Sequence, residues 1–158
     1  MIMARHFWMT VVSALAFSLS AYAADEKAAP VPDAVFPAAL EASAKQLAER
    51  LASGLAESLK SGDFAAFNAV QPEAAKRKFT ADTFAKMNTA LERRYGKLVN
   101  AEFFGRLDQG KVMDFLWKFS FEKSGDGDKK LHHEILLLVR TGSVKGEAVI
   151  AGFSFYFF

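Results

Sequence analysis

Cysteine is absent from the 158 residues of this chain. Its absence excludes disulfide bonds, thiolate metal sites, a thiol nucleophile and a lipid-modified cysteine at an export boundary. Proline is also scarce: there are four, and three of them lie in the short stretch from Pro30 to Pro37. Stability must therefore come from the packing of apolar side chains, which make up 51% of the sequence and include 16 phenylalanines. A chain of this length and composition can bury a sizeable core in a single domain.

Neither sign of charge is in excess, because 20 Lys and Arg residues stand against 18 Asp and Glu residues. Nucleic-acid-binding domains usually present a strongly basic face, so no nucleic-acid partner is predicted. The sequence also contains no glycine-rich loop of the kind that holds nucleotides. We therefore predict no cofactor.

Two short polar clusters resemble metal sites but lack the geometry for one. His132, His133 and Glu134 are consecutive, and neighbouring residues of a strand point to opposite faces, so they cannot chelate one ion. The Asp-Gly-Asp segment 126–128 resembles the start of a calcium loop, but Lys130 occupies the third ligand position. We predict a polar turn there and no metal site.

The longest apolar run lies near the N-terminus and predicts a cleavable export signal over residues 1–23. Arg5 provides a basic start, and Phe7–Ser20 is apolar but short for a membrane span. Ala21–Ala23 supplies the small residues of a cleavage site. We therefore expect a periplasmic or secreted protein with no membrane span after cleavage. An uncleaved N-terminal anchor is the alternative, which the acidic residues directly after Ala24 disfavour.

A leader rich in Ala and Pro (residues 24–37) precedes the helical part of the chain, and its prolines favour extended, flexible geometry. The leucines between Leu40 and Leu59 repeat at helical spacing and predict a long first helix. Gly62 can take the left-handed conformation that ends this helix, and Thr80 is suited to cap a later one. Pro37 is suited to be the first residue of the first predicted helix, which ends at Ser61 and Gly62. The second predicted helix covers residues 64–70, and the third runs from after Thr80 to Tyr95.

After Gly96 the apolar period changes from 3.6 to 2, which predicts strands. The connections between them are short and turn-like, so the strands should form an antiparallel meander. The predicted fold class is therefore α+β: three N-terminal helices packed on a curved four-stranded antiparallel sheet, in one domain over residues 38–158. The predicted strands cover residues 98–107, 111–123, 131–141 and 147–157.

Alternate residues of a strand face opposite sides of the sheet. The odd-numbered strand positions are almost all apolar, so we expect the helices to cover that face. The even-numbered positions carry most of the charge, including Arg106, and the turns set Asp114 opposite Arg140 and Glu122 opposite His132. The inward-facing set is Val99, Ala101, Phe103, Met113, Phe115, Trp117, Phe119, Phe121, Ile135, Leu137, Val139, Val149, Ala151, Phe153 and Phe155.

The even-numbered face also carries an apolar cluster ringed by charge, which suggests an interface. We predict self-association as a homodimer through this outer sheet face. Scattered surface hydrophobic residues, or cover by the leader, are the alternatives. The interface candidates are Phe104, Leu116, Leu136, Leu138, Ile150 and Tyr156.

Any pocket between the helices and the inner face is predicted to be mainly apolar and suited to an apolar small molecule. Proton transfer would need a carboxylate or imidazole there, and the inward positions hold no acidic residue except Glu147 at a strand end. His133 points inward, and the register places it between Phe121 and Phe155 as a residue at the edge of the core. A β-bulge, which swaps parity beyond it, would bring an outer carboxylate inside. No catalytic residue is predicted; the pocket candidates are His133, Tyr95, Trp117, Phe103, Phe115, Phe119 and Phe153.

Several turn and packing signals resemble those of one superfamily. They are the helix 51–59 running into Lys60–Phe64, the pair Phe79 and Thr80, the segment Tyr95–Lys97, and Ile150–Phe153 near the end. Together they resemble the nuclear-transport-factor-2-like superfamily, the cystatin-like α+β cone, and especially its small exported bacterial members of unassigned activity. The resemblance implies a conical pocket and frequent dimers packed through the outer sheet face. Relatives include ketosteroid-isomerase-like and scytalone-dehydratase-like enzymes as well as non-catalytic binding domains, and a fold does not choose between them.

The last strand suggests a different class of protein. Residues 153–158 end the chain on an aromatic residue, with Tyr156 two positions earlier, which resembles the terminal strand of outer-membrane barrel proteins. The preceding helices lack a sustained heptad, so a membrane anchor is the remote alternative. We therefore predict an exported, non-catalytic binding or assembly module. A small pocket enzyme of the isomerase or dehydratase kind is the main alternative.

The mature protein recovered from cells is expected to begin at Ala24, because signal peptidase cleaves after the small residues at positions 21 and 23. Mass spectrometry of the intact exported protein measures this start directly. A mass that corresponds to a start at Met1 or Met3 would contradict the prediction.

Overall fold

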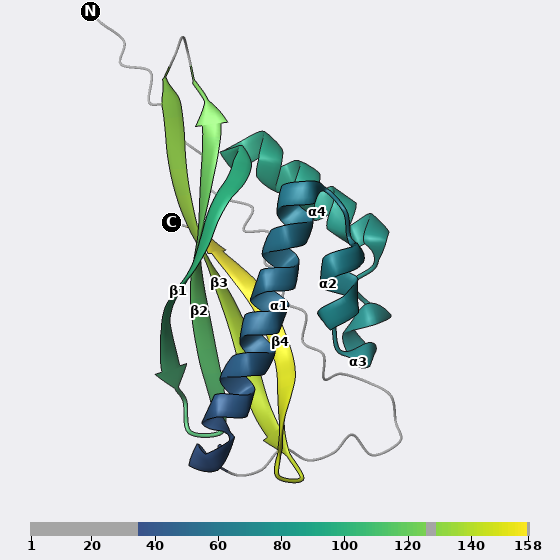
Figure 1. The fold of residues 1–158 in the computed structure, drawn as a ribbon, viewed down its shortest axis with the longest axis vertical. Helices are drawn as coiled ribbons and strands as arrows, with labels where there is room; N and C mark the ends of the chain where they lie inside the picture. The colour runs from purple at the N-terminus through teal and green to yellow at the C-terminus, as the bar shows by residue number, and fades with distance from the viewer. Residues whose placement is uncertain (1–34, 126–128, 158) are drawn as a thin grey trace, which may run out of the picture.

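The computed structural model of the chain describes residues 35–125 and 129–157. The predicted export signal and nearly all of the predicted leader lie outside these residues. The described chain is α+β, with helices first and a four-stranded antiparallel sheet after them (Figure 1), which confirms that part of the predicted fold. The elements are the 3-10 turn η1 (Ala38–Leu40), the helices α1 (Glu41–Ser61), α2 (Ala65–Val70), α3 (Glu73–Lys76) and α4 (Ala81–Tyr95), and the strands β1 (Lys97–Asp108), β2 (Val112–Ser124), β3 (Lys130–Val144) and β4 (Glu147–Phe157).

The helix ends follow from the residues at their boundaries. α1 ends where Gly62 takes a left-handed conformation with a φ of 75°. Asp63 Oδ1 then accepts a hydrogen bond of 3.0 Å from the N–H of Ala65 at the start of α2. Thr80 Oγ1 accepts one of 3.4 Å from the N–H of Thr83 at the start of α4. These side chains satisfy N–H groups that have no partner inside their helices.

α3 is a single helical turn that the sequence analysis did not predict. Pro72 has no N–H and cannot continue α2. It is instead the residue before α3, where its carbonyl accepts a hydrogen bond of 2.8 Å from the N–H of Ala75. One proline therefore ends the second helix and starts the third, and the chain turns a corner between them.

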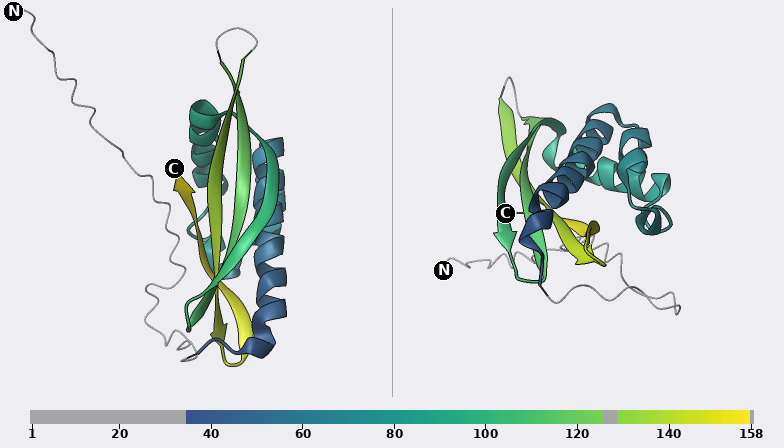
Figure 2. Two further views of the ribbon diagram at one scale, coloured as in Figure 1. Left: turned by 90° about the vertical axis from the view of Figure 1, so that its left-hand side faces the viewer. Right: turned by 60° about the horizontal axis from the view of Figure 1, so that its bottom comes forward.

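The strands are neighbours in chain order, so the sheet is a meander with β1 and β4 at its edges. α1 lies along the strands on one face, α2 and α3 lie beside α1, and α4 lies near the start of β1 (Figure 1). The left view of Figure 2 looks onto the opposite face, and no described helix lies in front of it. The sheet therefore has an inner face that the helices cover and an outer face without described helical cover.

The core lies between the inner face and the helices. Leu51, Leu55 and Leu59 of α1 are buried in one core cluster with aromatic residues of β2 and β4 and aliphatic residues of β3. Phe67 of α2 meets Phe79 edge-on at a ring-centroid distance of 5.4 Å and Phe153 of β4 at 5.5 Å. Such aromatic pairs contribute about 1 kcal/mol each beyond their burial. They attach α2 to the far edge of the sheet.

The packed part of the chain begins before the first helix. Phe36, which lies within the predicted leader, is buried in the core. Its N–H donates a hydrogen bond of 2.6 Å to the carbonyl of Gly110 in the turn between β1 and β2. Phe36 therefore belongs to the folded domain and holds the start of α1 against this end of the sheet.

Three irregularities in the strand register decide which residues face the helices. β1 carries two of them, with Val99 and Phe104 as the extra residues, and β4 carries one, with Ala151 as the extra residue. Each bulge inserts one residue, so the alternation of faces shifts by one position beyond it.

The predicted parity of β1 is wrong at its bulges. Leu98 is buried in the core, whereas Val99, which was predicted to face inward, is exposed. Arg106 was predicted on the outer face, but it forms an ion pair with Glu41 of α1 on the inner side. The two bulges of β1 are the physical reason for both differences.

The predicted parity of β4 is wrong before its bulge. Ile150 packs against the core, and Val149 takes the outer position that Ile150 was expected to hold. The prediction of Ile150 as an interface residue on the outer face is therefore wrong, because the extra residue Ala151 turns its side chain toward the helices.

β2 and β3 pair in the predicted register. His133 lies opposite Phe121, as predicted. Phe155, however, lies opposite Leu137, so its predicted position beside His133 is wrong. The two predicted charge pairs are confirmed as cross-strand neighbours: Asp114 with Arg140, and Glu122 with His132.

Candidate functional site

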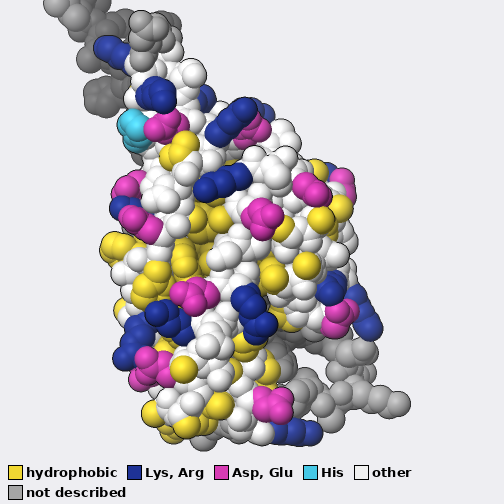
Figure 3. Space-filling model, viewed as in Figure 1, with side chains coloured by type: hydrophobic (Ala, Val, Ile, Leu, Met, Phe, Trp, Pro, Cys, Tyr) yellow, Lys and Arg dark blue, Asp and Glu magenta, His cyan; other side chains and the backbone are white. Residues whose placement is uncertain are grey.

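A groove runs between α1 and the first two strands. Its volume is about 600 Å³, within the range of about 300–1,000 Å³ that is typical of ligand pockets. Figure 3 shows hydrophobic side chains gathered along the seam between β1 and α1, with charged side chains above and below them. The groove is lined by Ala52, Ser53, Ala56, Glu57, Lys60 and Ser61 of α1, by Ala101 of β1 and by Trp117 of β2.

Small side chains on facing elements leave this space open. α1 presents Ala52 and Ala56 there, and β1 presents Ala101. Two residues further along β1, the ring of Phe103 lies beneath Lys45 of α1, with the Lys45 Nζ 4.9 Å from the ring centroid. This cation–π contact joins β1 to α1 beyond the groove.

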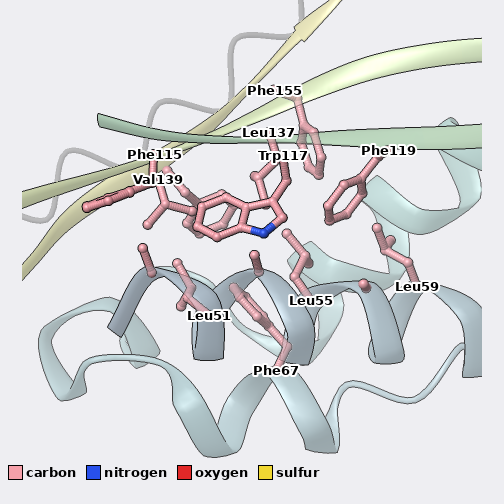
Figure 4. Close-up of a cluster of buried hydrophobic side chains, with 14 of the residues drawn as sticks. Leu51, Leu55, Leu59, Phe67, Phe115, Trp117, Phe119, Leu137, Val139 and Phe155 are labelled. Atoms are coloured by element: carbon pink, nitrogen blue, oxygen red, sulfur yellow. The ribbon is translucent and has the colours of Figure 1, made fainter. Parts of the chain in front are cut away.

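Trp117 forms the apolar floor of the groove. Its indole reaches from β2 toward α1 and lies near Leu55 (Figure 4). The residue is only 5% exposed, and the ring of Phe103 meets it edge-on at 5.4 Å between centroids. The other tryptophan, Trp8, lies within the predicted export signal, so Trp117 is the one tryptophan of a chain that starts at Ala24.

The rim of the groove carries both signs of charge. Glu57 and Lys60 are exposed, and neither forms an ion pair with another residue in the part of the chain that the structure describes. Ser53 and Ser61 add hydroxyl groups. Among the lining residues only Glu57 has a carboxylate, and none is a histidine. An apolar floor with a polar rim suits a ligand with an apolar body and a polar end.

The structure divides the predicted pocket residues between several places. Trp117 lines the groove, and Phe103 lies beside it. Phe115, Phe119 and Phe153 are buried in the core. The predicted set is therefore not the lining of one cavity, because most of its aromatic rings fill space instead of bordering it.

Tyr95 and His133 form a separate aromatic cluster that does not line the groove. The ring of Tyr95 meets His133 edge-on at 5.5 Å and stacks on Phe157 at 5.6 Å, with only 9° between the planes of that stack. Phe121 completes the cluster at 6.3 Å from Tyr95. His133 thus contacts Tyr95 at the end of α4, and it is partly buried.

Sequence reasoning missed the polar rim of the groove and its alanine wall. The signal was present in α1, where Ala52, Ser53, Gly54 and Ala56 follow one another within five positions. Small residues on a helix that covers a sheet leave space or allow close approach. Here Gly54 allows α1 to approach α2 closely, since a Cβ at this position would lie 2.6 Å from the side chain of Val70. The small side chains of the alanines leave open the space that forms the groove.

The outer face carries a contiguous apolar cluster, which we call the outer patch. At its margins Leu107 is 50% exposed and Tyr156 is 49% exposed. Phe104, the extra residue of a bulge, is 64% exposed beside it. Four interface candidates lie in the patch, although Leu138 is only 8% exposed, and Leu107 was not predicted. The outer patch consists of Leu107, Leu116, Leu136, Leu138 and Tyr156.

Charged residues bound the outer patch at both ends. At one end Lys118 Nζ lies 2.7 Å from Glu102 Oε1 and 3.3 Å from Glu134 Oε1. At the other end Asp114 pairs with Arg140. The charged side chains next to the patch are thus paired within the chain, with one carboxylate in excess at the Lys118 end.

Asp114 is the most thoroughly paired of these charged groups. It is fully buried, and Arg140 donates from Nε to Oδ1 and from Nη2 to Oδ2, both at 2.7 Å. Gln109 Nε2 donates a third hydrogen bond of 2.8 Å to Oδ2. The hydrogen bonds to Asp114 raise the pKa of the Arg140 guanidinium, so it stays charged. A bidentate pair of this kind fixes the orientation of both side chains.

The ion pairs of the outer face depend on pH in opposite directions. Hydrogen bonds to Glu102 and Glu134 raise the pKa of Lys118, so the stability from this cluster is lost as the pH rises through that raised pKa. The hydrogen bond from Lys130 lowers the pKa of Glu122, so the stability from this pair is lost as the pH falls through that lowered pKa. Both clusters are charged and paired near neutral pH.

No three potential metal-ligating side chains lie together among the residues described. No helix of residues 35–125 or 129–157 is long and apolar enough to cross a membrane. No family model matches the chain, and no curated protein matches its sequence. The groove and the outer patch are therefore the two surfaces from which a function can be argued.

Replacing Arg140 with Ala is expected to destabilise the protein by about 3 kcal/mol, because it leaves the buried Asp114 carboxylate without its partner. Urea unfolding followed by circular dichroism measures the change. The matched control is Lys118→Ala, which breaks pairs with the exposed Glu102 and Glu134 and is expected to cost much less than Arg140→Ala. Equal losses in the two variants would contradict the argument that the burial of Asp114 is what makes its pair important.

Proposed function

We propose that this protein is an exported, non-catalytic binding and assembly module that forms a homodimer through the outer patch. The observation that carries the proposal is a contiguous apolar cluster, half-exposed at its margins, on a sheet face with no described helical cover. Single exposed apolar residues are common on protein surfaces, but a cluster bounded by charge is typical of an interface.

The dimensions of the face suit a dimer. Strands of 11 to 15 residues with a rise of about 3.3 Å per residue and a spacing of about 4.8 Å give a face of about 40 by 19 Å. That is about 760 Å², close to the roughly 800 Å² that each partner of a stable complex buries. A second copy presents the same patch, so apolar residues would meet apolar residues across a two-fold axis.

The sheet edges favour association through the face. Both edge strands contain bulges: β1 has two and β4 has one. A bulge interrupts the regular row of N–H and C=O groups that another strand would need, and natural sheets use bulges to avoid pairing edge to edge. The flat apolar surface available to a second copy is therefore the outer patch.

A place in the nuclear-transport-factor-2-like superfamily is part of this proposal. Helices that precede a four-stranded antiparallel meander, and pack on one of its faces, support it. The outer patch occupies the face through which that resemblance implies dimers. The cone shape of the superfamily is proposed on the same grounds.

The groove supports a second candidate function, the binding of an apolar small molecule. Its alanine wall and the indole of Trp117 can bury an apolar body, and the hydroxyl and charged groups of α1 can hold a polar end. An isomerase- or dehydratase-like enzyme is the alternative for the same groove. It would have to use Glu57 as its base, because no other lining residue carries a carboxylate or an imidazole, and Glu57 is exposed on the rim.

Replacing Leu136 with Asp is expected to convert a dimer into a folded monomer. The side chain faces away from the helices, and the charge would be placed within the apolar interface. Lys118 lies directly opposite Leu136 on β2, so the new carboxylate has a neighbouring cation in the monomer. Sedimentation velocity of the chain that starts at Ala24 measures the oligomeric state, and circular dichroism shows whether the variant is folded.

Leu131→Asp is the matched control, because Leu131 is an exposed leucine on the same strand outside the outer patch. It should remain dimeric. A wild-type protein that sediments as a monomer at micromolar concentration would show that the outer patch is not a dimer interface. An unfolded Leu136→Asp variant would show that this residue belongs to the core.

An apolar ligand in the groove is expected to change the fluorescence of Trp117 in the chain that starts at Ala24. Octan-1-ol is a suitable probe, because it has an apolar body and one hydroxyl group. Ala101→Leu should abolish the change by filling the groove, whereas Ala42→Leu, at an exposed position of α1 outside the groove lining, should leave it intact. A titration that leaves the wild-type fluorescence unchanged, or an undiminished response in Ala101→Leu, would rule out this groove as the binding site.

A further inference from the structure

Two rows of side chains on α1 border the groove, and the first row is apolar until its last member. Residues four apart on a helix lie on the same face, one above the other. Ala52 and Ala56 belong to the row that faces the sheet, since Ala52 is 1% exposed and Ala56 is 8% exposed. The next residue of this row is Lys60, which also lines the groove and is exposed. The apolar path along α1 therefore ends at an ammonium group.

The second row lies on the solvent side of the first. It consists of Ser53, Glu57 and Ser61, which are four apart, exposed and part of the groove lining. Glu57 directly follows Ala56 in the sequence, so it flanks the apolar path before that path reaches Lys60. The same end of the groove therefore carries one anionic and one cationic side chain.

These two charged side chains do not neutralise each other. They are three positions apart, a spacing at which opposite charges on a helix can pair. Glu73 and Lys76 of α3, the same residue types at the same spacing, do form an ion pair. Glu57 and Lys60 form none, either with each other or with another side chain of residues 35–125 and 129–157. Both charges are thus free for a ligand, with about 5–6 Å between the two Cβ atoms.

We propose that the groove binds a single-chain amphiphile with a zwitterionic head, whose anionic group pairs with Lys60 and whose cationic group pairs with Glu57. The apolar chain lies along Ala52 and Ala56, over the indole of Trp117. A head with a single charge gains less, because one of the two side chains attracts it and the other repels it. The assignment of the head rests on the proposed binding of an apolar body in the groove, and it does not depend on dimer formation.

The test compares four probes that share an octyl chain and differ in the head. They are octan-1-ol, octanoate, octyltrimethylammonium and octylphosphocholine, each used below its critical micelle concentration. The fluorescence of Trp117 in the chain that starts at Ala24 reports binding. Two exposed charge pairs should make octylphosphocholine bind about fivefold more tightly than octan-1-ol. Octanoate and octyltrimethylammonium should bind about as weakly as octan-1-ol, since attraction and repulsion offset each other.

Variants that remove one charge test which side chain recognises which group of the head. Glu57→Gln should favour octanoate over octyltrimethylammonium, and Lys60→Gln should reverse that preference. Both variants should bind octylphosphocholine more weakly than the wild-type protein does. The matched controls are Glu49→Gln and Lys111→Gln, which change exposed residues outside the groove lining and should keep the wild-type order of the probes.

The possible results separate the zwitterionic head from the groove itself. Equal binding of all four probes would overturn the zwitterionic head but leave the groove as an apolar binding site. A wild-type protein that responds to none of the probes would overturn both. An unchanged order of the probes in Glu57→Gln and Lys60→Gln variants, shown to be folded by circular dichroism, would also overturn the assignment of the head.

Discussion

The inner face of the sheet is far larger than any one helix can cover. The arrangement of the whole domain depends on this difference between the area of the sheet and the area that a single helix buries. α1 has 21 residues, which at about 1.5 Å per residue makes it about 31 Å long, and its diameter of about 10 Å spans roughly two strands. α2 and α4 must therefore bury what α1 leaves uncovered. The aromatic contacts of Phe67 and Tyr95 attach these two helices to β4, so the cover is complete there. Beside β1 it is incomplete, and the groove is the result.

The bulges determine how the two faces are divided. In β1 they turn Arg106 toward α1, where it pairs with Glu41, and they leave Phe104 exposed at the edge of the outer patch. In β4 the bulge turns Ile150 into the core and Val149 to the outer face. The same three irregularities make the edges poor templates for another strand. They therefore direct association toward the outer face while they shape the inner one.

The groove and the outer patch lie on opposite faces of the sheet, and β1 and β2 contribute to both. Trp117 faces α1, and its neighbour Leu116 faces outward from the next position of β2. The alternation of a strand lets one short segment serve both surfaces without sharing a side chain. A substitution at one surface therefore need not alter the other, and binding and assembly are separable properties of this domain.

Periodicity determined the class of the fold, residue type determined the helix ends at Gly62 and Thr80, and the short turn between β2 and β3 determined the pairing of Asp114 with Arg140. Each of these depends on residues close in sequence or on strands joined by short turns. The positions of the bulges could not be predicted from the sequence pattern. A strand accepts an extra residue where side chains from distant elements pack better around that residue. The residues of β4 before Ala151 were therefore assigned to the wrong faces. The sequence also could not separate aromatic rings that fill the core, such as Phe115 and Phe119, from the ring of Trp117 that borders a groove. That distinction is decided by how much space facing elements leave between them, and only the tertiary structure sets that distance.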